Sequence, residues 1–436
     1  MTRAAGTAAR LIEVRVESLA HEGRGVARVD GKAVFIDNAL AGERVCARIV
    51  RRHRRYDEAV ATEIMEPAPQ RVAARCPHFS ICGGCSLQHL DPAAQIGHKQ
   101  AMLLDQLAHV GKVQPARLLP PLTGPLWGYR RRARLGVRHV PKKGGVLVGF
   151  REKASNFLAE ITGCEVLDPG VGRLIQPLRG AIGDLSIADR IPQIEVAVGD
   201  RGAALTFRHL APLLPADRQR LAEFGQSHDI AIYLQPGGND TVAPLWPEVP
   251  APLAYELPAH GVVIEFLPLD FIQVNGAINI AAIDLAIELL DLGASDHVLE
   301  FFCGLGNFSL PMARRVARVV GLEGDRGLVE RARANAVRNG IANAEFIAAD
   351  LSVAAVPAGG FNKMLLDPPR SGALELVRRL DLAGVERLLY VSCNPATLAR
   401  DAGVLVRERG MTLAAAGIMD MFPHTAHVES IALFQT

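Results

Sequence analysis

Two residues near the C-terminus have the chemical types that methylation of a pyrimidine carbon requires. Cys393 lies in the segment 390–395, and the acid Glu429 lies in the segment 422–430. Carbon 5 of uracil is a weak nucleophile, but a thiolate that adds to carbon 6 converts the ring into a reactive enolate. A base must then remove the proton from carbon 5. The pair therefore predicts a pyrimidine-alkylating site with Cys393 as nucleophile and Glu429 as base. A buried structural role is the commoner fate of a single cysteine.

The elements that must position these residues form an alternating pattern. After Glu265, short apolar segments alternate with helical segments, which is typical of a doubly wound parallel sheet. The first apolar segment runs into a turn with Gly304 and Gly306, and the next ends at Glu323. Ligands of such sheets bind at the carboxyl ends of the strands, where an acid commonly receives ribose hydroxyls. Because the third glycine of the dinucleotide fingerprint is missing, the turn favours S-adenosylmethionine over NAD.

A third candidate for the chemistry is Asp367, which ends a later apolar segment and precedes Pro368, Pro369 and Arg370. Two prolines fix the turn and remove two backbone donors. We expect them to hold Asp367 toward the sulfonium of the cofactor and the target ring. A rigid loop is one alternative, and an adenine N-methyltransferase, which needs no cysteine, is another.

Three of the seven cysteines crowd one loop, at Cys76, Cys82 and Cys85, and a fourth, Cys164, follows far downstream. In a reducing compartment such crowding favours metal binding or catalysis over disulfides. Four thiolates bind either zinc or an iron–sulfur cluster. We expect the two other cysteines outside the catalytic segment, Cys46 and Cys303, to be small buried residues.

Basic residues are clustered although the net charge of the 436-residue chain is only +2. One cluster spans residues 51–55, and a second combines Trp127 and Tyr129 with four arginines, namely Arg130, Arg131, Arg132 and Arg134. Guanidinium groups bind phosphates and aromatic rings stack on unpaired bases, so the second cluster is a candidate RNA contact. A solvated charged face is the alternative. No signal peptide and no apolar stretch of roughly 18 residues is present, so we expect a cytoplasmic protein without a membrane segment.

The chain is long enough for two or three domains. Residues 1–67 alternate apolar and polar positions between glycine turns, as in a small β-barrel. Prolines begin a second region, 68–265, with mixed strands, short helices and loops, and residues 266–436 carry the helix–strand alternation. We therefore predict three domains with these boundaries.

Five motifs together resemble the RNA uracil-5-methyltransferase family across nearly the whole chain: 270–275, 302–307, 367–370, 392–395 and 427–430. The resemblance implies a class I methyltransferase sheet, with Cys393 as nucleophile, Glu429 as base and Asp367 in the site. It also implies that S-adenosylmethionine contacts a set of six residues, Gln273, Phe302, Asn307, Glu323, Asp350 and Asp367. Asp350 stands where other members carry asparagine. His424 and His427 either orient the Glu429 loop or are structural.

The N-terminal region resembles the TRAM domain, an OB-like barrel of RNA-modifying enzymes, on segments 23–27 and 41–45. Cys76, Cys82, Cys85 and Cys164 resemble the [4Fe-4S] ligands of the ribosomal RNA branch of the family. By the same resemblance, residues 92–126 pack on the catalytic domain. Barrel and cluster together imply 23S ribosomal RNA as the partner. Separately, we expect a monomer. A transfer RNA methylase of the same architecture and a non-catalytic RNA-binding assembly factor remain alternatives.

Overall fold

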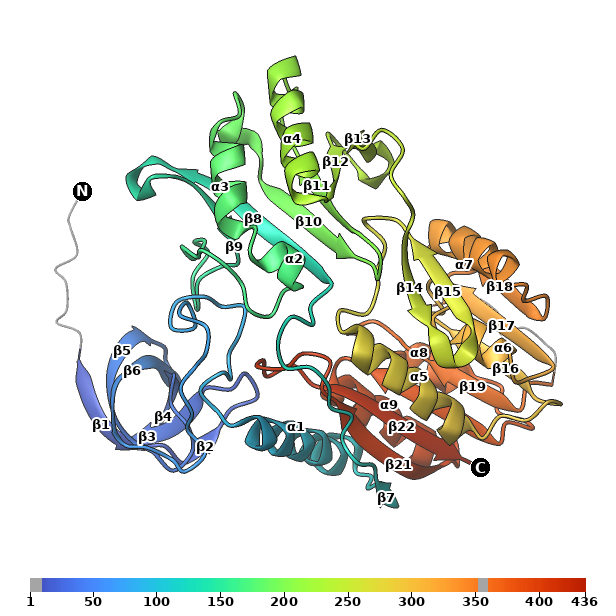
Figure 1. Ribbon diagram of the computed structural model, residues 1–436. Helices are drawn as coiled ribbons and strands as arrows, with labels where there is room; N and C mark the ends of the chain where they lie inside the picture. Colours follow the sequence, from blue (N-terminus) through green and yellow to red (C-terminus); the bar gives the residue numbers. More distant parts are fainter. Residues whose placement is uncertain (1–9, 352–359) are drawn as a thin grey trace. The chain divides into compact units, whose positions relative to one another are not determined.

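The computed structural model describes residues 10–351 and 360–436 (Figure 1). The chain separates into two compact units. The first comprises the residues up to Lys99 together with Glu152–Ala154 and His424–His427, and the second comprises Gln100–Arg151, Ser155–Pro423 and Val428–Thr436. The predicted border at residues 265 and 266 falls inside the second unit, so the division into three domains stays a prediction. In the described part of the chain, no helix is long and apolar enough to cross a membrane.

The first unit contains a six-stranded sheet in the order β1-β5-β6-β4-β3-β2. Its strands are β1 (Leu11–Arg15), β2 (Ser18–Leu19), β3 (Gly25–Val29), β4 (Lys32–Asp37), β5 (Arg44–Arg52) and β6 (Tyr56–Glu66). β1 also contacts β3, which closes the sheet into the predicted barrel (Figure 1). Alternate residues such as Val45 and Ala47 fill its core. The expectation that Cys46 is buried was wrong, because it lies between these two residues and alternation turns it to the half-buried outer face.

The second unit contains an eight-stranded sheet in the order β18-β17-β16-β19-β20-β22-β21-β7. Its strands are β7 (Arg117–Leu118), β16 (His297–Phe301), β17 (Arg318–Glu323), β18 (Ala344–Ala348), β19 (Lys363–Leu366), β20 (Arg387–Ser392), β21 (Thr412–Met419) and β22 (Glu429–Gln435). The five strands from β16 to β20 are parallel, whereas β22 is antiparallel to both β20 and β21. This confirms the predicted doubly wound sheet. β7 brings residues 117–118 into it, beside β21.

Helices pack on this sheet: α5 and α9 both contact β20, and α7 contacts β17 and β18 (Figure 1). The α-helices within residues 10–351 and 360–436 are α1 (Pro92–Gln106), α2 (Pro169–Gly172), α3 (Ile175–Gly183), α4 (Pro215–His228), α5 (Gly276–Leu290), α6 (Ser309–Ala313), α7 (Arg326–Arg338), α8 (Leu374–Arg379) and α9 (Pro395–Arg407). The apolar α5 and the sheet strands share one large core. That core makes the carboxyl ends of the parallel strands a rigid edge.

A second sheet of this unit has the order β13-β12-β11-β10-β8-β9 and supports α3 and α4 (Figure 1). Its strands are β8 (Arg132–Val140), β9 (Gly145–Gly149), β10 (Gln193–Val198), β11 (Ala203–Arg208), β12 (Ala231–Gln235) and β13 (Ala243–Trp246). The hairpin of β14 (Leu253–Leu257) and β15 (Val262–Phe266) follows and packs against α7. The predicted second region is therefore a mixed α and β segment.

Candidate active site

The register of two strands brings Cys393 and Glu429 to the same place. In the antiparallel pair β20 and β22, Ser392 lies opposite Ser430, and the Ser430 hydroxyl donates to the Ser392 carbonyl at 3.3 Å. Cys393 follows the last residue of β20, and Glu429 is the first residue of β22. One further step in the register therefore sets Cys393 opposite Glu429. Strand pairing therefore brings together two residues that are more than thirty positions apart in sequence.

Asp367 joins this pair from the neighbouring strand. Asp367 follows β19, and the last residue of β19, Leu366, pairs with Tyr390 of β20. The backbone amide of Asp367 donates to the Phe301 carbonyl at 3.3 Å. Burial, together with the charges of Glu429 and Glu323, raises the pKa of Asp367 to about 8. Asp367 therefore keeps its proton at neutral pH and can donate a hydrogen bond.

The thiol of Cys393 is half-buried and sits in a field of mostly negative charge. Burial, together with the charges of Glu429 and Asp367, raises its pKa to about 11, and Arg370 acts in the opposite direction. At neutral pH the free protein therefore holds Cys393 mainly as the thiol. Such perturbed groups gathered at a strand edge are typical of functional sites.

The glycine turn after β16 forms the other half of the edge. Phe302 has a left-handed backbone with φ of 65°, which is uncommon for a non-glycine residue and is often found at functional sites. Gly306 has φ of 87°, and an added Cβ there would lie 3.0 Å from Leu310. Glu323 at the end of β17 accepts hydrogen bonds from the amides of Gly304, at 3.1 Å, and Asp325, at 3.0 Å. The turn and the acid of the sequence prediction thus contact each other directly.

Asn307 is held by two residues that sequence reasoning missed. Its side-chain amide exchanges two hydrogen bonds with Asn279 of α5, at 2.8 and 3.0 Å, and accepts one from the Tyr255 hydroxyl at 2.8 Å. Asn279 and Tyr255 also line a cavity of about 220 Å³ together with Gln273. The sequence did contain a signal, because Asn279 is a polar residue on a strongly apolar helix. Gln273 therefore lines the same cavity as the two residues that hold Asn307.

Asp350 lies two residues beyond the end of β18, which is parallel to β17. It is exposed, and it belongs to the same carboxyl edge as Glu323. Five of the six cofactor candidates therefore follow or end strands of this edge or its glycine turn, and Gln273 precedes α5.

A buried thiol, Cys303, and a buried carboxyl group, Glu300, lie near the turn and have structural roles. Cys303 is 2% exposed and packs beside Gly321 of β17, so the expectation of a buried residue is confirmed. Burial raises its pKa well above that of an ordinary thiol. Glu300 is 1% exposed and accepts a hydrogen bond from the Ser309 hydroxyl, and burial raises its pKa to about 8. These two buried side chains support the turn from the protein interior.

The three clustered cysteines lie in a tight loop of the first unit. The amide of Cys82 donates to the His78 carbonyl at 2.8 Å, and the amide of Gly84 donates to the Cys82 sulfur at 3.4 Å. Cys85 is buried, and Cys164 belongs to the second unit. Among residues 10–351 and 360–436, no group of three or more His, Cys, Asp or Glu side chains is placed to hold a metal ion.

The predicted RNA-contacting arginines are engaged within the protein. Arg131 pairs with Asp200 at 2.6 Å. Arg132 pairs with Glu195 at 3.1 Å and is largely buried, which lowers its pKa, while Arg134 pairs with the same Glu195 but stays 69% exposed.

Arg130 differs from its three neighbours because it faces aromatic rings. Its guanidinium lies 5.8 Å from the ring centre of Phe150 and 5.9 Å from that of Phe422. By contrast, Arg51 and Arg52 on the barrel are exposed. The structure thus gives most of the second arginine cluster a structural role in addition to its predicted one.

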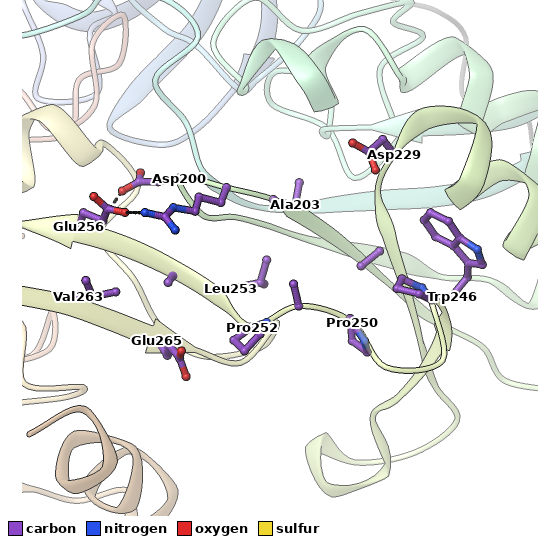
Figure 2. A pocket seen from close by; sticks show the side chains of 16 residues that line it. Asp200, Ala203, Asp229, Trp246, Pro250, Pro252, Leu253, Glu256, Val263 and Glu265 are labelled. Atoms are coloured by element: carbon purple, nitrogen blue, oxygen red, sulfur yellow. Dashed lines mark hydrogen bonds and ion pairs between the residues drawn. The ribbon is translucent and has the colours of Figure 1, made fainter. Parts of the chain in front are cut away.

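A second cavity, of about 460 Å³ (Figure 2), is lined by none of the predicted site residues. Its apolar wall includes Trp246, Pro250 and Leu253, and its rim carries Asp200 and Glu256. Arg201 pairs with Glu256 at 2.5 Å, as the dashed line in Figure 2 marks. A rim of carboxylates disfavours nucleic acid, so this cavity contributes nothing to the proposed chemistry.

Comparison with known proteins defines the class. The family model described as tRNA (Uracil-5-)-methyltransferase matches residues 260–436, and that of the TRAM domain matches residues 9–62. A solved tRNA (uracil-54, C5)-methyltransferase from Pyrococcus abyssi, in complex with S-adenosyl-L-homocysteine, has the same fold, with a TM-score of 0.75 and 24% identity over 97% of this chain and 99% of that one. The fold and the strand-end site define an S-adenosylmethionine-dependent methyltransferase with an N-terminal TRAM domain.

The relatives narrow the class to a family. A protein from Alkalilimnicola ehrlichii named 23S rRNA (uracil(1939)-C(5))-methyltransferase RlmD is 55% identical over 97% of this chain and 96% of its own length. A protein of the same name from Thiobacillus denitrificans is 53% identical over 97% of this chain and 99% of its own length. The chain belongs to the RNA uracil-5-methyltransferase family, as the five motifs predicted.

Proposed function

We propose that this protein transfers the methyl group of S-adenosylmethionine to carbon 5 of a specific uridine in 23S ribosomal RNA. The observation that carries the proposal is the register of β20 and β22, which pairs Ser392 with Ser430 and so sets a thiol opposite a carboxylate. The names of full-length relatives support 23S RNA as the substrate. A transfer RNA substrate is the second candidate, because the fold matches a transfer RNA enzyme and fold constrains substrate weakly.

The chain's own residues divide the chemistry as follows. The target uridine leaves its stack to reach the site. The Cys393 thiol first gives its proton to solvent water, and the thiolate sulfur then bonds to carbon 6. The electrons of the C5–C6 double bond move toward the carbon 4 carbonyl oxygen, to which the protonated Asp367 donates a hydrogen bond. S-adenosylmethionine supplies an electrophilic methyl group to carbon 5. Glu429 then takes the carbon 5 proton, the C–H electrons form the ring double bond, and the C6–S bond breaks with its electron pair on Cys393.

Six residues are proposed to bind the cofactor: Gln273, Phe302, Asn307, Glu323, Asp350 and Asp367. The Asn279 and Tyr255 contacts to Asn307 support this assignment, because they fix the orientation of its amide. Glu323 is suited to ribose hydroxyls, since its oxygens already accept hydrogen bonds from neutral donors.

The test of the mechanism uses RNA containing 5-fluorouridine. Fluorine at carbon 5 cannot leave as a proton does, so the thiol mechanism stalls as a covalent protein–RNA adduct. We expect the adduct with the parent protein and S-adenosylmethionine, and none with Cys393→Ala. Normal turnover by Cys393→Ala would sink the mechanism in favour of direct N-methylation, and the absence of methyl transfer by the parent protein would favour an assembly factor. Assays of isolated 23S RNA and transfer RNA in parallel identify the substrate.

We further infer that Cys76, Cys82, Cys85 and Cys164 hold a [4Fe-4S] cluster. Two features of the loop support thiolate ligands: the Gly84 amide points at the Cys82 sulfur, and the Lys153 ammonium stands over the Phe79 ring, 3.8 Å from its centre, in the electrostatic field of Cys82 and Cys85. Donors and cations around sulfur stabilise anionic clusters. A cluster with four protein ligands has a structural role, because nucleophilic methylation requires no electron.

Metal analysis of protein purified without oxygen tests this inference. We expect iron and acid-labile sulfide in about equal amounts, near four per chain, as the cluster type requires. Cys46→Ser serves as a matched control outside the loop and keeps the full iron content, whereas Cys85→Ser loses it. A content of one zinc per chain and no iron would contradict the cluster and would indicate a zinc site instead.

A further inference from the structure

A short segment just before the proposed base is held by an unusual set of contacts. Residues 424–427 belong to the first unit, and the chain reaches Glu429 after only one further residue, Val428. The backbone carbonyl of His424 accepts hydrogen bonds from the amides of Ser86 and Leu87, both at 2.9 Å. The amide of Ala426 donates to the Ser86 hydroxyl at 2.9 Å.

Gln95 of α1 supplies further contacts to this segment. Its side-chain oxygen accepts from the His424 amide at 2.9 Å, and its nitrogen lies 3.3 Å from Nδ1 of the same histidine. That nitrogen also donates to the carbonyls of Leu87, at 3.0 Å, and Leu90, at 2.8 Å. Gln95 is 2% exposed and His424 is 3% exposed. The buried side-chain amide of Gln95 thus bonds both to His424 and to the backbone carbonyls of the 87–90 loop. A fully hydrogen-bonded buried amide of this kind fixes the geometry of the groups that it joins.

The held segment is also strained and packed. His424 has a left-handed backbone with φ of 65°, a conformation that persists only where the surroundings enforce it. Ala426 packs against the small core of Leu40, Leu87 and Leu90. The backbone before Glu429 is therefore confined by hydrogen bonds and by packing at successive residues.

We propose that Ser86, Leu87 and Gln95, hereafter the clamp, are positioning residues that set the carboxylate of Glu429 for removal of the carbon 5 proton. The proposal rests on the proposed function, because it takes Glu429 as the base. Ser86 and Leu87 directly follow Cys85, so part of the clamp continues the cysteine loop. A displacement of about 1 Å in a reacting group slows a step by about a hundredfold.

A defect in removal of the carbon 5 proton can be detected as a specific covalent intermediate. Methyl transfer precedes proton removal, so a misplaced Glu429 leaves an intermediate with the Cys393–C6 bond intact and a methyl group already on carbon 5. Ordinary RNA without fluorine then accumulates as a covalent methylated adduct. Loss of folding or of RNA binding produces no such adduct, which separates positioning from a structural role.

The experiment compares Gln95→Met with the parent protein and with Gln100→Met. Gln100 lies on the same helix and is half-buried, and its side chain forms no hydrogen bond with the described residues, so it controls for the substitution itself. RNA with natural uridine and S-adenosylmethionine carrying a labelled methyl group are supplied to each. We expect Gln95→Met to lose about tenfold to a hundredfold in turnover, to transfer its first methyl group at the parent rate, and to accumulate labelled protein–RNA adduct.

Ser86→Ala provides a second, milder variant if Gln95→Met does not fold, and it should show the same adduct in smaller amount. Turnover at the parent rate without adduct in a folded clamp variant would overturn the proposal. Equal slowing of the first methyl transfer and of turnover, without adduct, would overturn it too. Failure of the parent protein to form an adduct with 5-fluorouridine RNA would instead contradict the proposed function.

Discussion

At the residue scale, the site raises the pKa of both its carboxyl group, Asp367, and its thiol, Cys393, above their ordinary values. Asp367 keeps a proton at neutral pH, and Cys393 keeps its own well above it, because desolvation and the charge of Glu429 raise the pKa of both groups. RNA must then bind and reorganise this charge before the thiol can add.

The first prediction concerns the reactivity of Cys393 in the free protein. Because only the thiolate is alkylated, and because the pKa is about 11, the rate of alkylation by iodoacetamide should rise about tenfold per pH unit from 7 to 9 without a plateau. Mass spectrometry of the peptide that contains Cys393 measures this rate. Cys303, which is 2% exposed, should stay unmodified throughout. A plateau near pH 8 would show that the charges around Cys393 do not act as described.

A second prediction links Asp367 to stability. Its pKa is about 8 in the folded protein and near 3.8 when unfolded, so between these values unfolding releases a proton. The contribution of Asp367 to stability is therefore complete below pH 3.8 and is lost as the pH rises toward 8. Asp367→Asn lacks this loss, so its melting temperature should exceed that of the parent by a margin that grows from pH 5.5 to pH 8, while its activity disappears. A margin that shrinks with rising pH would contradict the assignment.

At the element scale, the turn after β19 is tied to the start of α9. The Asn394 side-chain oxygen caps α9 by accepting from the Ala396 amide at 3.1 Å, and its nitrogen donates to the Arg370 carbonyl at 3.1 Å. The Thr397 hydroxyl lies 3.3 Å from the same carbonyl. One residue therefore both begins a helix and holds the loop that carries Arg370, whose charge acts on Cys393.

These two roles of Asn394 can be separated. Asn394→Ala loses both and should lower the free energy of unfolding by about 1 kcal/mol, the usual worth of an N-cap. Asn394→Ser keeps a cap but is too short to reach Arg370, so stability should stay near that of the parent. Both variants should form the 5-fluorouridine adduct more slowly. Adduct formation at the parent rate by Asn394→Ser would show that the tie to Arg370 is dispensable; urea unfolding and adduct kinetics provide the measurements.

At the scale of the whole molecule, basic charge available to RNA is distributed unevenly. Arg131 and Arg132 are committed to Asp200 and Glu195. Arg51 and Arg52 on the barrel are exposed, and the neighbouring His53 stacks on Tyr56 with ring centres 4.3 Å apart. A basic, aromatic face on an OB-like barrel suits single-stranded RNA.

RNA binding should therefore depend on the barrel arginines through their charge. For each of Arg51→Ala and Arg52→Ala, the slope of log affinity against log salt should fall by about 0.7 to 0.9, the value for one lost phosphate contact. Arg201→Ala is the matched control, since Arg201 is exposed but pairs with Glu256 on a carboxylate rim. Equal slopes for Arg51→Ala and Arg201→Ala would contradict a barrel footprint. Filter binding across a salt series measures them.

Sequence reasoning reached the fold class and the chemical types of the site because both depend on local patterns. The helix–strand alternation, the glycine turn and Asp367 before two prolines are each readable within a few residues. Their convergence at one edge follows from the rule that parallel strands share a carboxyl end. The roles of Cys393 and Glu429 followed from their side-chain chemistry, and the family resemblance implied the same roles.

Only the tertiary structure decided which distant residues meet. The partners of Asn307, the carboxylates that engage Arg131 and Arg132, and the clamp that joins Gln95 to His424 across 329 positions have no local signature. A hydrogen bond between distant residues depends on strand register and helix packing, which are set by burial over the whole chain. Local patterns therefore specified the reagents, and long-range packing determined how they are held.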